Sequence, residues 1–369
     1  MMDKWDRMML ARDARITGDA NIQLVVMRTR TIELVGPNHW PNVVMHASSS
    51  SLIVRNKVSL LLLLIRTNHG TGGGHRMTVK KVLVTGAGGQ TGHNAIQCLH
   101  EHSGTIEVCA GIHKTDQEKQ KAALAKFKVT TCELEAEDKS KLVDKFKDVQ
   151  DLYVIPPSSE EKVQCACNYI DAAKDAGVRF VLLLSNFKAD RKDYFWGESF
   201  LKIEEHLKKS GIPSWTIIRA NFYAQNLLLY KEQINAGELP LPTADGKFAP
   251  IDVNDIGKAA SSILVDSSKH HNRVYTLTGP EAVDGFGIAA TLSVIFGREI
   301  KYRNISKDDA RKILQSQNVP EIEIRSLLSY YELVQNNMAA DVTDDFMQLT
   351  GRPPKSMRQF CEAHKSEFA

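Results

Sequence analysis

The sequence has few cysteines, no long apolar run and almost no excess charge, and each shortage excludes a class of protein. Its 6 cysteines among 369 residues form no Cys-x-x-Cys pair, which argues against a disulfide framework and structural zinc and favours free thiols. The longest apolar run, 58–65, is far shorter than the roughly 20 residues that span a bilayer. A formal net charge of +3 gives no reason to expect nucleic acid as a direct partner. We therefore expect a cytoplasmic protein with no metal and no membrane partner; assembly into a homo-oligomer stays open.

Several catalytic signatures are also missing. The sequence contains no Gly-x-Ser-x-Gly elbow, no Walker lysine and no His-Glu-x-x-His pair. None of the 9 tyrosines has a lysine four residues later, and the position four before Lys202 is Glu198. The Tyr-x-x-x-Lys dyad of short-chain reductases is therefore excluded in that form.

The small net charge is the sum of two unlike segments. Residues 1–76 hold 10 Lys and Arg against 5 Asp and Glu, whereas the remainder is slightly acidic. No helical or strand periodicity persists in 1–76, so we predict a basic, disordered extension that is dispensable for binding. A transit peptide is the alternative; the arginines favour it, and Asp3, Asp6 and Asp13 argue against it.

From residue 77 onward, short apolar runs alternate with amphipathic ones. This βαβ pattern predicts a Rossmann-type parallel sheet with helices on both faces over 77–233. The pattern loosens after residue 233 and predicts a smaller α/β lid over 234–369. Ser158-x-x-Glu161 predicts a capping box at a helix start. The six expected strands cover 79–85, 107–113, 129–134, 151–155, 179–184 and 214–219, and three lid helices are expected over 284–296, 307–317 and 321–336.

A glycine turn between the first strand and first helix carries the most information. A dinucleotide pyrophosphate must approach the backbone closely, which residues without a Cβ allow, and a helix amino terminus supplies free N–H donors. Gly92 is expected to let the helix pack closely on the sheet. The alternative is a tight turn without a ligand. The predicted cofactor-binding turn consists of Gly86, Ala87, Gly88, Gly89, Gln90, Thr91 and Gly92.

The end of the second strand favours NADP(H) over NAD(H). A carboxylate there would bind the ribose 2′-hydroxyl, whereas a base would bind a 2′-phosphate. The strand ends with His113 and Lys114, and no carboxylate follows before Asp116. A solvated loop lysine without a ligand is the alternative.

Other candidates follow the later strands, because ligands of open parallel sheets bind at the strand carboxyl ends. Pro156 is expected to border the nicotinamide, Ser185 and Asn186 to meet a carboxamide or substrate carbonyl, and Asn221 and Phe222 to close over the nicotinamide. For each of these residues the alternative is a structural role at a strand end or in a loop, without a ligand.

Lys202 is a candidate for ribose binding or proton donation if burial lowers its pKa. Its spacing from Glu198 equally fits a surface i,i+4 ion pair. The sequence alone favours neither the functional role of Lys202 nor the surface ion pair.

At this point the sequence resembles the NmrA-like family of atypical short-chain dehydrogenase/reductases over roughly 79–368. The resemblance lies in the glycine turn, in Lys202–Leu207, Ile251–Gly257, Leu277–Pro280 and Thr350–Arg352. It implies a Rossmann domain with a small lid, NADP(H) as the usual dinucleotide, and a lysine at the nicotinamide ribose that Lys202 matches. The sequence departs from the family where members often have Arg-Pro, because here Ala220 follows Arg219.

Two functions follow as expectations. The first is an NADPH-dependent oxidoreductase that transfers hydride to a small conjugated carbonyl, quinone or imine, with Lys202 and Ser185 as its catalytic residues. The second is a regulator that binds NADP(H) without turning it over, because the family that the sequence resembles includes both.

Overall fold

The computed structural model describes two compact units, Met1–Arg76 and Met77–Ala369, which are considered separately. In the first unit β1 (Leu24–Arg28), β2 (Thr31–Val35) and β3 (Val43–His46) form an antiparallel sheet, which the sequence analysis did not predict. The rest of the predicted extension lies outside the described residues. In the second unit the described residues are 79–113, 117–127, 129–192 and 194–368.

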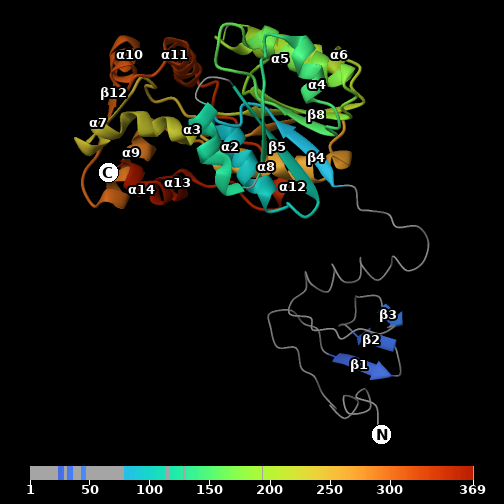
Figure 1. Cartoon of the computed structure of the whole chain (residues 1–369). Coiled ribbons are helices and arrows are strands. Elements are labelled where there is room, and N and C mark those ends of the chain that lie inside the picture. Colours follow the sequence, from blue (N-terminus) through green and yellow to red (C-terminus); the bar gives the residue numbers. More distant parts are fainter. Residues whose placement is uncertain are drawn as a thin grey trace. The chain divides into compact units, whose positions relative to one another are not determined.

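Seven parallel strands form the central sheet of the second unit, which confirms the predicted Rossmann-type fold (Figure 1). The strand order reverses between β4 and β7, and open α/β sheets bind their ligands outside the carboxyl ends of the strands at such a point. The strand at one edge, β11, comes from the segment that was expected to form the lid. It belongs to the central sheet, where it pairs with β9. In spatial order the strands are β6 (Thr130–Glu133), β5 (Ile106–Ile112), β4 (Lys80–Val84), β7 (Asp151–Val154), β8 (Phe180–Asn186), β9 (Ser214–Ala220) and β11 (Arg273–Leu277).

Helices cover both faces of this sheet (Figure 1). Helix α6 (Gly197–Lys209) shows why, since it buries Phe200, Ile203 and Leu207 on one stripe and leaves its other side exposed. With α6 lie α4 (Lys139–Lys145) and α5 (Lys162–Asp175); the opposite face carries α2 (Gln90–His100), α8 (Val253–Val265) and α12 (Asp345–Thr350), while α3 (Gln117–Leu124) follows β5.

The remaining elements gather at one end of the unit (Figure 1). There β10 (Glu238–Leu241) pairs in parallel with β12 (Lys301–Asn304). The three predicted lid helices are present with nearly the predicted bounds, as α9 (Gly285–Phe296), α10 (Lys307–Ser316) and α11 (Glu321–Gln335). The others are α7 (Lys231–Asn235), α13 (Met357–Ala363) and α14 (Lys365–Phe368).

One local prediction is wrong. Helix α5 begins at Lys162 rather than after Ser158, and Glu161 stands at the N-cap without a side-chain hydrogen bond. The Ser158 capping box therefore does not form.

Among the described helices, none is long and apolar enough to cross a bilayer. All 6 cysteines lie in the described ranges and are free thiols.

Candidate functional site

The glycine turn lies where the strand order reverses. Thr85 joins the ends of β4 and β7, because its Oγ1 accepts from Ile155 N at 2.8 Å and donates to Ile155 O at 3.3 Å. Gly86 follows with φ +59°, a conformation that glycine adopts without strain. The Ala87 N–H donates to Gly111 O at 3.0 Å, which ties the turn to β5. The turn is thus fixed between three strands.

The amino terminus of α2 has no side-chain cap. Gly89 stands at its N-cap without a side-chain cap hydrogen bond, and no acidic residue lies in the first turn. Gly88, Gly89 and Gln90 are exposed. A Cβ on Gly92 would lie 2.4 Å from Gly86 O, so Gly92 allows close contact with the turn itself, rather than with the sheet as expected. A glycine-lined, uncapped helix terminus at the switch point fits a dinucleotide pyrophosphate.

The other residues predicted to contact the cofactor differ in their exposure. His113 directly follows β5 and is exposed, Pro156 directly follows Ile155 and is buried, and Lys114 lies outside the described residues. Thr91 is buried and its Oγ1 donates to Tyr223 Oη at 3.4 Å. This contact joins the segment after β9 to α2.

Ser185 belongs to a buried polar cluster at the ends of β8 and β9. Its hydroxyl donates to Glu204 Oε1 at 2.7 Å. Arg219 donates to both oxygens of the same carboxylate, through Nε at 2.9 Å and through a terminal guanidinium nitrogen at 2.8 Å. The Glu204 side chain is 0% exposed and that of Arg219 is 20% exposed. Planar, two-point pairing of this kind locks both side chains.

The electrostatics of Glu204 follow from these contacts. Burial raises the pKa of its carboxyl, but the hydrogen bonds from Arg219 and Ser185 and the Arg219 charge lower it by more. The net pKa lies below its ordinary value, so Glu204 is ionised at neutral pH. The Ser185 hydroxyl therefore holds a carboxylate, and its catalytic role stays a prediction.

Lys202 forms the ion pair that its spacing allowed. Its Nζ lies 2.8 Å from Glu198 Oε1, and both side chains are about 60% exposed. Lys202 lies on the side of α6 opposite to Glu204. Its role at a ribose stays a prediction.

Asn221 and Phe222 belong to a second buried cluster just beyond β9. The Oδ1 of Asn221 accepts from Phe222 N at 2.8 Å and from Tyr330 Oη at 2.6 Å. Phe222 packs among the rings of Phe248, Tyr330 and Tyr331, at centroid distances of 5.1 to 5.9 Å. Phe222 is thus a 5% exposed core residue that links β9 to α11.

Sequence reasoning missed the contacts of Tyr194 and Tyr330 at the strand ends. Asn186, at the end of β8, donates from Nδ2 to Tyr194 Oη at 2.9 Å. Tyr194 reaches this place from the loop before α6, and Tyr330 from α11. No local spacing connects these segments, so only the fold reveals that they meet at the strand ends.

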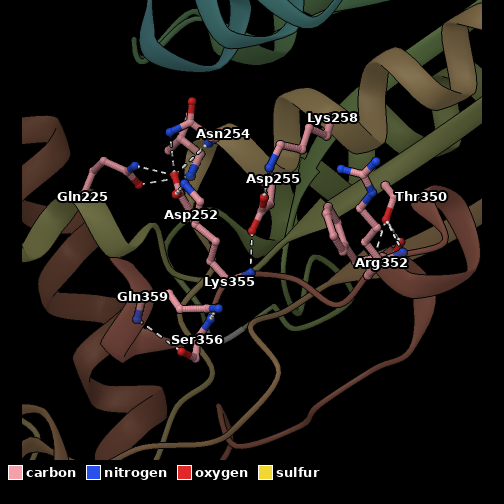
Figure 2. A network of polar contacts seen from close by, with 12 residues as sticks. Gln225, Asp252, Asn254, Asp255, Lys258, Thr350, Arg352, Lys355, Ser356 and Gln359 are labelled. Carbon is pink, nitrogen blue, oxygen red and sulfur yellow. Dashed lines mark hydrogen bonds and ion pairs between the residues drawn. The ribbon is translucent and has the colours of Figure 1, made fainter. Parts of the chain in front are cut away.

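A further polar network links Gln225, which follows β9 in the chain, to α8 and to the carboxyl-terminal segment (Figure 2). Asp252, the N-cap of α8, accepts from Lys355 Nζ at 2.6 Å and from Gln225 Nε2 at 2.7 Å. Asp255 accepts from Lys355 N at 2.7 Å and from Lys258 Nζ at 2.8 Å. These contacts tie the carboxyl-terminal segment to α8, which packs closely on α2 through Gly257.

Comparisons with known proteins agree with this architecture. The model of the NmrA-like family matches residues 78–352. The NAD(P)H azoreductase of Xenophilus azovorans is 32% identical over 222 residues, which cover 60% of this chain and 77% of that protein. An NADPH-dependent quinone oxidoreductase of Escherichia coli, solved with NADPH, aligns with a TM-score of 0.69 and 25% identity over 77% of this chain and 99% of its own. NmrA, a negative transcriptional regulator solved with NAD, shares the fold at a TM-score of 0.63 and 17% identity over 77% and 94% of the two chains.

Proposed function

Because the chain belongs to the NmrA-like family, we propose that it is an NADPH-dependent oxidoreductase that transfers hydride to a small conjugated carbonyl, quinone or imine. The observation that carries this proposal is the uncapped amino terminus of α2 at the strand-order reversal, next to a glycine turn in which Gly92 leaves no room for a Cβ. A bound nicotinamide would supply the hydride, and the protein would supply binding, orientation and electrostatics.

We assign the residues the roles that the sequence predicts for them. The glycine turn holds the pyrophosphate, and Lys114 with His113 receives the 2′-phosphate. Pro156, Asn221 and Phe222 border the nicotinamide end, and Lys202 holds its ribose.

Ser185 and Lys202 are the proposed catalytic residues. The Ser185 hydroxyl acts next to the Glu204 carboxylate, which it already contacts. Lys202 has to leave Glu198 to reach a ribose, and this costs little because exposed i,i+4 pairs contribute only about 0.5 kcal/mol.

The names of the relatives favour an enzyme. One is an NAD(P)H azoreductase, and a second, 29% identical over 244 residues, is quinone oxidoreductase 2 of Escherichia coli. Both names combine redox chemistry with a flat conjugated acceptor. We expect the same class of acceptor here.

Calorimetric titration with NADPH and NADH, followed by NADPH oxidation with quinones, enones, imines and azo compounds, tests the proposal. We expect NADPH to bind at least tenfold more tightly than NADH and at least one acceptor to be reduced. The Lys114→Ala variant is expected to lose this preference while it still binds NADH. Equal affinity for the two dinucleotides in the wild type would contradict the NADP(H) assignment.

A regulator that binds NADP(H) without turnover is the second candidate. It is favoured by the engagement of the Ser185 hydroxyl with Glu204 and by the lack of a Tyr-x-x-x-Lys dyad. Tight NADPH binding without oxidation by any acceptor of the panel would decide for it.

A further inference from the structure

The side-chain amide of Asn221 has a fixed orientation. The backbone N–H of Phe222 can only donate, so the atom that faces it at 2.8 Å must be the amide oxygen. Tyr330 donates to the same oxygen at 2.6 Å. The Nδ2 group therefore points away from both, and its position does not depend on an arbitrary choice between nitrogen and oxygen.

That Nδ2 group is a buried donor without an acceptor. Asn221 is 2% exposed, and its Nδ2 has no hydrogen-bond partner among the described residues. An unmet buried donor costs about 1–3 kcal/mol. Buried polar groups in folded proteins almost always have a partner, so this amide is available to an acceptor that arrives with a ligand or a water molecule.

Tyr194 presents a second hydroxyl near the ends of the same two strands. Asn186 and Ala220 are paired at the ends of β8 and β9, so Asn186 and Asn221 leave neighbouring strands at the same edge. Asn186 donates to Tyr194 Oη, and a side-chain hydrogen bond with Ser326 likewise lowers the pKa of Tyr194. Both contacts use the phenol oxygen as an acceptor, so its own O–H is left to donate. Burial raises the pKa of Tyr194 to about 12, so the hydroxyl keeps its proton at neutral pH.

We propose that the Asn221 amide and the Tyr194 hydroxyl form a two-donor site that binds a carbonyl oxygen at the reacting end of the cleft. This inference rests on the proposed function and specifies the ligand group that the cleft selects. Two sources offer the same chemistry, the carboxamide of a bound nicotinamide and the carbonyl of a quinone or enone.

Both donors are held in place before any ligand arrives. Asn221 is fixed by Phe222 and Tyr330, and the ring of Tyr330 packs on Phe222 at 5.1 Å between centroids. Tyr194 is 4% exposed and fixed by Asn186. A site arranged in advance loses little conformational entropy on binding, which favours carbonyl ligands over equally flat ones without an acceptor oxygen.

Calorimetry with three probes tests the site in the full-length protein. The probes are NADP⁺, adenosine 2′,5′-bisphosphate, which lacks the nicotinamide, and menadione added to the NADP⁺ complex, where no hydride is available. Asn221→Asp keeps the oxygen that Phe222 and Tyr330 bind and replaces the donor with an acceptor. Tyr194→Phe removes only the hydroxyl, and it tests the proposed site by itself if Asn221→Asp fails to fold. Tyr331→Phe is the matched control, because it removes a buried hydroxyl that contacts Tyr230 instead.

We expect Asn221→Asp to weaken the affected probe at least tenfold and Tyr194→Phe to weaken it about fivefold, with Tyr331→Phe unchanged. If the variants bind NADP⁺ more weakly but bind adenosine 2′,5′-bisphosphate with unchanged affinity, the ligand of the site is the nicotinamide carboxamide. If the variants bind menadione more weakly, and its carbonyl stretch shifts upward in isotope-edited infrared spectra, the ligand of the site is the substrate carbonyl. Wild-type affinity for all probes in folded variants would overturn the inference alone. A wild-type protein that binds no dinucleotide would overturn the proposed function as well.

Discussion

The two ends of the candidate cleft are built on different principles. At the glycine turn, the backbone forms the site, and side chains matter mainly by their absence, as at Gly92. At the ends of β8 and β9, buried side chains form the site, with Glu204 held by Ser185 and Arg219 and with Asn221 held by Tyr330. The first end should therefore respond to added atoms, and the second to lost charges and hydrogen bonds.

The largest effect should come from removing the charge of Glu204. In Glu204→Gln the Arg219 guanidinium loses its buried counter-ion, and removing one partner of a buried pair costs about 3–5 kcal/mol. We expect the free energy of unfolding, measured with denaturant, to fall by about 3 kcal/mol. Glu205→Gln is the matched control, because Glu205 forms an exposed pair with Lys209; the loss of stability should stay within about 0.5 kcal/mol. Equal losses in the two variants would contradict the assignment of Glu204 as a structural anchor.

The same carboxylate predicts a dependence on pH. Because the pKa of Glu204 is lowered in the folded protein, its stabilisation is complete above the ordinary glutamate pKa of about 4.3 and is lost as pH falls through the lower folded value. Wild-type stability should fall more steeply than that of Glu204→Gln below about pH 4. Parallel stability curves over this range would contradict the sign of the pKa shift.

The second effect concerns the glycine turn. In Gly92→Ala the new Cβ would meet Gly86 O at 2.4 Å, so the turn must move. Overpacking of this kind costs about 1–3 kcal/mol, and we expect NADPH affinity to fall by about tenfold or more in calorimetry. Gly104→Ala, where no atom lies within 4 Å of the new Cβ, should bind NADPH as the wild type does.

These two ends also differ in how far the sequence predicts them. The glycine turn is a local signal, and its position after β4 and at the start of α2 follows from seven consecutive residues. The reacting end joins Asn186, Tyr194, Asn221 and Tyr330, which come from four segments, and no spacing rule relates them. Strands such as β4 and β8 were predicted because buried apolar runs set their limits. The pairing of β11 with β9 was missed because strand order depends on tertiary packing.

A smaller effect should follow from removing one contact of the polar network around Asp252 and Asp255. Lys355→Met removes a donor to the fully buried Asp252 carboxylate, which keeps Gln225 as a partner. We expect a loss of about 1–2 kcal/mol in stability and little change in NADPH affinity. Lys258→Met serves as the control, because Lys258 is half exposed and should cost less than about 0.5 kcal/mol.

The smallest effect on stability belongs to Lys202. Lys202→Gln breaks an exposed i,i+4 pair, so stability should change by less than about 0.5 kcal/mol. If Lys202 holds the ribose, NADPH affinity should still fall about fivefold, whereas Lys209→Gln, which breaks a similar pair further along α6, should leave it unchanged. Unchanged affinity in both variants would remove Lys202 from the site.

Anaerobic mixing of the protein–NADPH complex with menadione tests the account most directly, because it requires both ends of the cleft at once. We expect reduced-nicotinamide absorbance to disappear in a protein-dependent reaction, faster in the wild type than in Gly92→Ala or Tyr194→Phe. Tight NADPH binding with no loss of this absorbance, for menadione and for every other acceptor of the panel, would contradict the account.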